Sequence, residues 1–122
     1  MKRLFVYGTL MSGLDKNGRM AGARLLCRDC RTLSDFSMYI YEGFPFVFEG
    51  RNRYRIKGEL YEVPADVLKC LDEYEGGFYF RKLTEVECGC DTITAFMYFG
   101  RGHFFGMKEV SDGDYRKFSG EK

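Results

Sequence analysis

Hydrophobic and polar positions alternate along much of the chain, which predicts strands more often than helices. The clearest alternation covers residues 51–63, RNRYRIKGELYEV. One side of this run carries Arg51, Arg53, Arg55, Lys57 and Glu59. A period of two is typical of a half-buried strand with a charged face in water, so we expect all five charged residues to be solvated.

Shorter apolar or alternating runs predict the remaining strands. We expect these at residues 3–7, 23–30, 35–41, 46–49, 79–88 and 92–99. An aromatic bend around Gly43 and Pro45 separates the runs 35–41 and 46–49. Residues 11–22 show no sustained hydrophobic period, which indicates a loop with one helical turn.

The sequence predicts one main helix, from Pro64 to about Tyr74. Proline suits the first turn of a helix, and Gly76 suits the residue after its end. Many strands with one main helix indicate an α+β fold. We expect a small mixed β-barrel of about six strands with short helical turns. A doubly wound parallel sheet would need more helices. We expect a single domain over residues 1–122, with a partly mobile, glycine-rich tail from about residue 101.

Composition and charge narrow the class of protein. At 122 residues, with 45% hydrophobic and 30% charged residues, the chain can bury a core without metals or disulfides. The net charge of +1 argues against a nucleic-acid or membrane-surface partner, so the basic residues 51–57 are interpreted as a solvated face. No run of about 18 apolar residues is present, and the apolar stretch at the N-terminus is too short for a signal peptide, so we expect a cytoplasmic protein.

Five cysteines form an odd set, which predicts free thiols in a chain without a secretion signal. Cys27, Cys30, Cys88 and Cys90 could together supply four thiolates to zinc, but the second spacing is tight and both pairs fall in strands. We therefore expect no metal and no cofactor. Cys70 is expected in the core.

Two nearby glutamates on the predicted helix differ in direction. At ~100° per residue, an apolar arc is formed by Val67, Cys70, Leu71 and Tyr74, with Leu68 at its edge. Glu75 falls inside this arc, whereas Glu73 falls on the opposite face. Burial raises the pKa of a carboxyl group and makes it a better proton acceptor near neutral pH, so Glu75 is a candidate acid/base. The alternative is a terminal glutamate that turns outward from a frayed helix end.

The segment Tyr7-Gly8-Thr9-Leu10 follows the first strand. Glycine at this point permits a turn with positive φ, in which successive N–H groups converge on an anion. A simple strand-ending turn is the alternative.

Several short motifs occur in a characteristic order along the chain. They are FVYGTL (5–10), GELYEV (58–63), LDEYEG (71–76), then Tyr79 and Arg81, and AFMY (95–98). With them the sequence resembles the γ-glutamylcyclotransferase-like family, which includes γ-glutamylamine cyclotransferases and plant avirulence-induced relatives. The resemblance covers residues 4 to about 100 and leaves the tail outside.

The resemblance implies a barrel with a pocket between the YGTL loop and the helix end. Glu75 is implied as the general acid/base, and the backbone of Tyr7, Gly8, Thr9 and Leu10 as the holder of the substrate's glutamyl head.

The resemblance further implies that Tyr79 and Tyr98 line the pocket, while Arg81 could brace the fold through an ion pair. The chain departs from the family at the next motif. Family members often have Gly-x-x-Asn after YGTL, whereas Gly13 and Asn17 are four residues apart here.

The implied activity is an enzyme of the γ-glutamyl cyclotransferase type, which cyclises a small γ-glutamyl amine or amide to 5-oxoproline and releases the amine. The alternative is a non-catalytic small-molecule-binding domain that keeps the pocket. The sequence leaves the leaving amine and the oligomeric state open.

Overall fold

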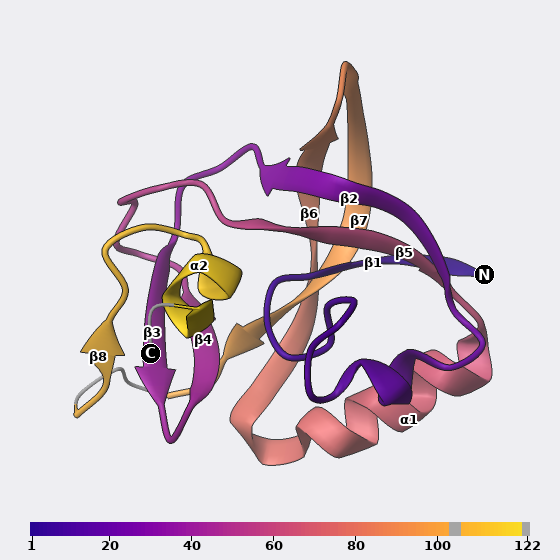
Figure 1. The fold of residues 1–122 in the computed structure, drawn as a ribbon, viewed down its shortest axis with the longest axis horizontal. Helices are drawn as coiled ribbons and strands as arrows, with labels where there is room; N and C mark the ends of the chain where they lie inside the picture. Colours follow the sequence, from indigo (N-terminus) through magenta and orange to yellow (C-terminus); the bar gives the residue numbers. More distant parts are fainter. Residues whose placement is uncertain (103–105, 121–122) are drawn as a thin grey trace.

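The computed structural model describes residues 1–102 and 106–120, in which five strands close into a barrel (Figure 1). The barrel order is β1-β5-β2-β6-β7. The strands are β1 (Lys2–Val6), β2 (Arg24–Thr32), β5 (Lys57–Val63), β6 (Tyr79–Cys88) and β7 (Asp91–Gly100). Neighbours are antiparallel except β1 and β7, which pair in parallel to close the ring. The predicted α+β class with a small mixed barrel is confirmed.

A second sheet of three strands lies beside the barrel, in the order β4-β3-β8. It contains β3 (Ser37–Tyr41), β4 (Phe44–Phe48) and β8 (Lys108–Glu109). Glu42 and Gly43 connect β3 to β4 with φ values of 52° and 84°. Positive φ at both positions is the geometry of a tight two-residue hairpin turn. Pro45 follows on the edge strand, where its missing N–H breaks no ladder.

The main helix, α1 (Ala65–Glu75), lies across one end of the barrel (Figure 1). Pro64 is its N-cap, and Gly76 ends it with a φ of 48°, as the sequence predicts. The shorter helical elements are the 3₁₀ turns η1 (Asn17–Met20) and η2 (Gly76–Phe78) and the helix α2 (Tyr115–Gly120). Among the described residues no helix has the length and apolarity needed to cross a membrane.

The buried stripe of α1 differs in one place from the prediction. Leu68 and Leu71 are buried, whereas Cys70 is exposed, so its assignment to the core is wrong. Cys70 lies about 200° around the helix from Leu68, whereas Leu71 and Glu75 lie within about 60° of it. The barrel therefore meets a narrow stripe through Leu68, Leu71 and Glu75.

The strand predicted over 51–63 is shorter than expected. β5 begins at Lys57, and within residues 51–56 only Tyr54 forms a β-bridge, with Phe36. Glu59 is only 4% exposed, so its placement on a solvated face is wrong. The loop after β1 covers it, and Ser12 donates to its carboxylate from the backbone N–H (2.7 Å) and from Oγ (2.6 Å). Alternation along one strand cannot reveal a loop that folds over it.

The C-terminal region packs onto the rest of the molecule. Val110 and Tyr115 are buried, and the Tyr115 hydroxyl donates to the Gly43 carbonyl at 2.8 Å. Asp114 accepts a hydrogen bond from the N–H of Lys117 and so caps α2. The expected mobility of the tail partly concerns 103–105 and 121–122, which lie outside the described residues.

The cysteines differ from the expectation that all are free thiols. A disulfide joins Cys30 of β2 to Cys88 of β6, while Cys27, Cys70 and Cys90 are free. The two bonded residues are direct partners across the antiparallel pair, with their Cα atoms 4.6 Å apart. These residues, 58 positions apart in the sequence, become neighbours because β2 pairs with β6 in the barrel.

Candidate active site

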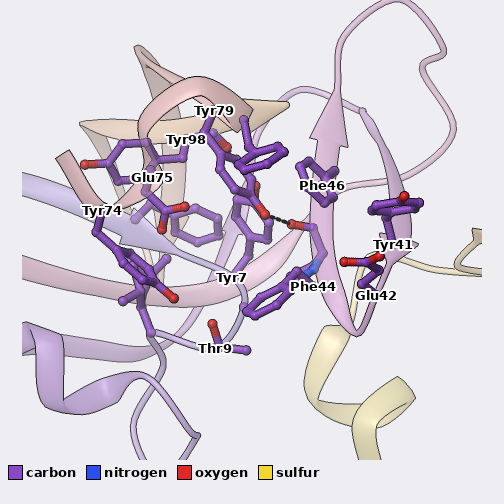
Figure 2. A pocket seen from close by; sticks show the side chains of 16 residues that line it. Tyr7, Thr9, Tyr41, Glu42, Phe44, Phe46, Tyr74, Glu75, Tyr79 and Tyr98 are labelled. Carbon is purple, nitrogen blue, oxygen red and sulfur yellow. Dashed lines mark hydrogen bonds between the residues drawn. The ribbon is translucent and has the colours of Figure 1, made fainter. Parts of the chain in front are cut away.

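A cavity of about 470 Å³ lies between the end of α1, the loop after β1 and the β3–β4 hairpin. Figure 2 shows Tyr74 and Glu75 on one side of it, and Tyr41, Phe44 and Phe46 of the hairpin on the other. The structure brings together at this cavity all of the predicted site residues, which are Tyr7, Gly8, Thr9, Leu10, Glu75, Tyr79 and Tyr98.

Glu75, the last residue of α1, is half-buried at the cavity and points its carboxylate into it (Figure 2). Burial raises the pKa of this carboxyl group to about 7, and the positive charge of Arg19 opposes the shift. Near neutral pH the group is therefore divided between its two protonation states. A carboxyl group in this condition can accept a proton in one step and donate it in the next.

The end of α1 is held by Asp72, a residue that the sequence analysis passed over. Its Oδ1 accepts hydrogen bonds from the Tyr98 hydroxyl (2.6 Å) and Arg81 Nε (2.9 Å), and its Oδ2 accepts from Arg81 Nη2 (3.0 Å). Burial favours a higher pKa for Asp72, but the hydrogen bonds from Arg81 and Tyr98 outweigh it and lower the pKa. The ion pair expected of Arg81 thus exists, and it fixes the helix turn from which Glu75 projects. Asp72 belongs to the motif LDEYEG, and this position in the motif could have identified it as a site residue.

Three of the tyrosines that line the cavity, Tyr7, Tyr79 and Tyr98, use their hydroxyl groups in hydrogen bonds within the protein. Tyr7 donates to the Tyr98 carbonyl at 2.8 Å, and Tyr79 donates to the Pro45 carbonyl at 2.7 Å (Figure 2). Burial is the main reason why the pKa values of Tyr7, Tyr79 and Tyr98 lie far above the ordinary value. The negative charge of Glu75 contributes in the same direction. These side chains therefore stay neutral and serve the cavity mainly as aromatic walls.

In the loop after β1, two backbone N–H groups, those of Thr9 and Leu10, have no acceptor among the described residues. Its carbonyls at Gly8, Thr9 and Leu10 accept hydrogen bonds from Met11 N–H (3.0 Å), Lys16 N–H (2.9 Å) and Asn17 Nδ2 (2.8 Å). Asn17 therefore secures this loop despite its shifted spacing, and two donors are left for a ligand.

Gly8 has a different role from the one that the sequence suggested. Its φ is not positive, so the left-handed turn that glycine would permit does not occur at Gly8. The absence of a side chain matters because a Cβ at this position would lie 2.5 Å from Pro45 Cγ. The loop and the β3–β4 hairpin thus meet in close contact at the floor of the cavity.

Replacing Gly8 by alanine is expected to destabilise the protein by about 1–3 kcal/mol, the usual cost of overpacking. The added methyl group must push the loop away from Pro45, so ligand binding should weaken as well. Gly18, in the 3₁₀ turn η1 between β1 and β2, is the control, because a Cβ added there has no heavy atom within 4 Å. Urea denaturation of both alanine variants would measure the effect. Equal stability of the two variants would contradict the proposed contact.

The mouth of the cavity is aromatic and exposed. Tyr41 (46%), Phe44 (39%) and Phe78 (68%) keep much of their surface accessible. All three line the cavity, as does Glu42. The sequence analysis missed these residues, although the run YEGFPFVF around the aromatic bend was a signal for Tyr41, Glu42 and Phe44.

The cavity contains no cluster of metal-ligating side chains within the described residues. The group of three or more such residues found in residues 1–102 and 106–120 is Cys27, Cys30 and Cys88, none of which lines the cavity.

The fold is a closed barrel of five strands. The half-buried carboxyl group of Glu75, at the end of the main helix, shares the cavity with the free N–H groups of Thr9 and Leu10. This combination is typical of the γ-glutamylcyclotransferase-like class of protein. The chain belongs to the family "Gamma-glutamyl cyclotransferase, AIG2-like", which it matches over residues 4–117. The match extends into α2, so the expectation that the tail lies outside the family is wrong.

Individual relatives agree with this assignment. A provisionally named gamma-glutamylcyclotransferase of Methanocaldococcus jannaschii is 32% identical over 130 residues, covering 98% of this chain and 100% of that relative. The crystal structure of YkqA from Bacillus subtilis has a TM-score of 0.82 and 26% identity, with 99% of this chain but 43% of YkqA covered. A mouse AIG2-like protein has a TM-score of 0.79 at 24% identity, with coverage of 90% and 86%, and shows similarity of fold.

Proposed function

We propose that this protein cyclises a γ-glutamyl amine or amide to 5-oxoproline and releases the free amine, with Glu75 as general acid/base. The observation that carries the proposal is the half-buried Glu75 carboxyl group, which points into a cavity across from the loop of residues 7–10. Membership of the family supports the reaction class.

The reaction needs no nucleophile from the protein. The α-amine of the substrate attacks its own γ-carbonyl carbon, a new C–N bond closes the five-membered ring, and the C–N bond to the leaving amine breaks. Glu75 takes the proton from the attacking nitrogen and returns it to the leaving nitrogen. Intramolecular proximity can supply up to ~7–11 kcal/mol of the barrier reduction, provided that the cavity holds the substrate folded.

The free N–H groups of Thr9 and Leu10 would bind the negatively charged part of the substrate. They suit either the α-carboxylate of the glutamyl head or the oxygen of the γ-carbonyl as it gains charge. The walls formed by Tyr7, Tyr79 and Tyr98 would exclude water from the reacting atoms. The leaving amine would then extend toward the aromatic mouth of the cavity.

Incubation with a panel of γ-glutamyl amines and γ-glutamyl amino acids tests the proposal. Release of 5-oxoproline and amine in equal amounts is the expected result. Tight binding of such compounds without turnover would instead support a non-catalytic binding domain. Absence of both binding and turnover across the panel would contradict the assignment of this cavity.

The pH dependence of kcat/KM should report the carboxyl group of Glu75. The base must be ionised in the free enzyme, so kcat/KM is expected to rise with pH and to bend near pH 7. Initial rates between about pH 3.5 and 9 would measure this limb, with ionisation of the substrate amine titrated separately. A bend near pH 4.5, the ordinary pKa of a glutamate, would contradict the effect of burial.

Titration of Glu75 also changes the stability of the protein. As pH rises, kcat/KM is expected to increase, whereas the free energy of unfolding is expected to decrease. Because burial raises the pKa of Glu75 from 4.5 to about 7, the folded state binds more protons than the unfolded state between these pH values. The contribution to the free energy of unfolding is complete below pH 4.5 and is lost as pH rises through about 7. At 1.36 kcal/mol per pKa unit, and discounted for solvent screening, the loss is about 1–3 kcal/mol.

A further inference from the structure

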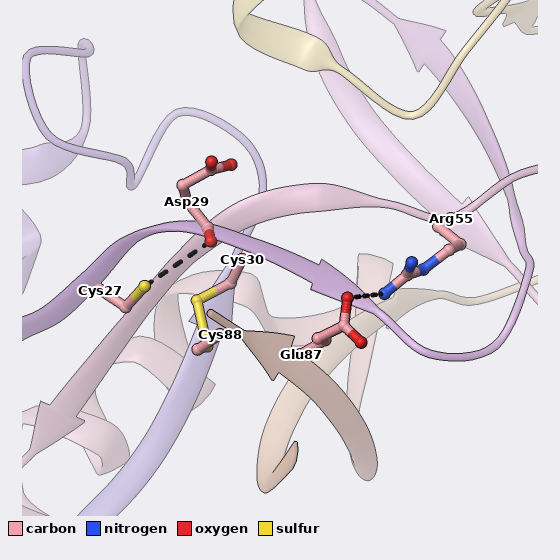
Figure 3. The surroundings of a disulfide bond; sticks show 6 residues. All are labelled: Cys27, Asp29, Cys30, Arg55, Glu87 and Cys88. Atoms are coloured by element: carbon pink, nitrogen blue, oxygen red, sulfur yellow. Dashed lines mark hydrogen bonds and ion pairs between the residues drawn. A yellow bond between two sulfur atoms is a disulfide. The ribbon is translucent and has the colours of Figure 1, made fainter. Parts of the chain in front are cut away.

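Three cysteine sulfurs converge on one side of the barrel, away from the active-site cavity. The Sγ atoms of Cys27, Cys30 and Cys88 all lie within 4.8 Å of one another (Figure 3). Cys30 and Cys88 are joined as a disulfide, and Cys27 is a half-buried free thiol beside them. The proposed reaction uses none of these residues.

A β-bulge explains why Cys27 and Cys30 share a face. Residues three apart on a regular strand point to opposite faces. Here Cys27 pairs with Leu60 and Cys30 with Gly58, so three steps along β2 are matched by two steps along β5. One extra residue therefore lies between the two cysteines and reverses the alternation. Cys88 completes the group because it lies directly opposite Cys30 on β6.

We propose that Cys27, Cys30 and Cys88, once the disulfide is reduced, form a three-thiolate site for a single thiophilic metal ion, with Cu(I) as the preferred ion. A dithiol reductant would open the Cys30–Cys88 bond, giving two thiols and becoming a disulfide itself. Binding of Cu(I) to the three thiols then releases three protons and forms three Cu–S bonds, with no further change of oxidation state.

The number of ligands favours Cu(I) over zinc. Structural zinc sites are almost always four-coordinate, whereas soft thiolate ligands select Cu(I). Asp29 is the nearest candidate for a fourth ligand, but it meets Cys27 through its backbone carbonyl (3.7 Å from Sγ), and its carboxylate points away in Figure 3. Cys90 is exposed and is not part of the cluster.

Burial makes the site selective among the five cysteines. Cys30 is fully buried and Cys27 half-buried, so an ion held between them is largely shielded from solvent and competing thiols. Cys70 and Cys90 are exposed and lie outside the cluster, so they serve as controls of the same chemistry.

The experiment uses the full chain, reduced with dithiothreitol under argon, freed of reductant by gel filtration and titrated with Cu(I) against a chromogenic Cu(I) chelator. We expect one Cu(I) per chain in the reduced wild type and in the Cys90→Ser variant, and none in the oxidised wild type. Cys27→Ser should weaken binding by roughly tenfold or more, since even lost outer-shell contacts cost 10–100-fold in metal affinity.

Alkylation of the wild type, followed by mass spectrometry, makes the test independent of any variant. Cys27, Cys30 and Cys88 should react with iodoacetamide more slowly in the Cu(I)-loaded protein than in the reduced metal-free protein, while Cys70 and Cys90 react equally in both. Modification of the three cluster cysteines at the same rate in both proteins would overturn the proposal. Equal affinity of Cys27→Ser and wild type, or no uptake by the reduced chain, would do the same.

Discussion

Replacement of Glu75 by glutamine is expected to lower kcat/KM for a γ-glutamyl substrate by about 10²–10⁴-fold, the usual contribution of a general acid/base. Glutamine keeps the shape of the side chain but can neither accept nor return the proton. Substrate binding should change little, because the proposed anion donors belong to the loop backbone at Thr9 and Leu10. Rates of 5-oxoproline formation, together with ligand binding measured by calorimetry, separate the two effects.

Glu73 provides the matched control for this substitution. It lies on the same helix two residues earlier and is exposed, so Glu73→Gln makes the same chemical change in water. We expect wild-type turnover from Glu73→Gln. We also expect Glu75→Gln, unlike Glu73→Gln, to lose the decline in stability between pH 4.5 and about 7. Undiminished turnover in Glu75→Gln would reject the proposed role of this carboxyl group.

Replacement of Leu71 by alanine is expected to cost about 2–5 kcal/mol of the free energy of unfolding, as for other buried leucines. Leu71 is 1% exposed and anchors α1 on the barrel. Its loss leaves a cavity beneath the helix turn that carries Asp72 and Glu75. Turnover should therefore fall together with stability, which chemical denaturation and activity assays on the same preparation would record.

The adjacent Cys70 gives a sharp comparison, because the sequence pattern and the structure disagree about it. Cys70→Ala should stay within about 0.5 kcal/mol of wild type, since the side chain is exposed. A loss as large as that of Leu71→Ala would restore the wider apolar arc that the sequence suggested. It would also contradict the placement of α1 against the barrel.

The features that sequence could predict are those that depend on local pattern. The strands from 79–88 and 92–99 alternate or are apolar throughout, and they occur as β6 and β7. The end of α1 at Gly76 follows from glycine's tolerance of positive φ, and the position of Glu75 on the helix follows from the helical period.

The features that sequence missed depend on contacts between distant segments. The burial of Glu59 results from a loop that folds over β5, and the need for glycine at position 8 results from Pro45. The clustering of Cys27 with Cys30 requires a bulge that no local pattern marks. Each case involves a neighbour far away in the chain, which one strand's periodicity cannot reveal.

The parallel contact between β1 and β7 has a consequence for the order in which this protein is made. Only Leu4 with Phe96 and Phe5 with Met97 are matched between these strands, and they join the first strand of the barrel along the chain to the last strand of the barrel. During synthesis the barrel therefore stays open between β1 and β7 until β7 has left the ribosome. Tyr98, which lines the cavity, directly follows Met97 and is synthesised with β7. The nascent chain therefore contains Glu75 well before the cavity around Glu75 is complete.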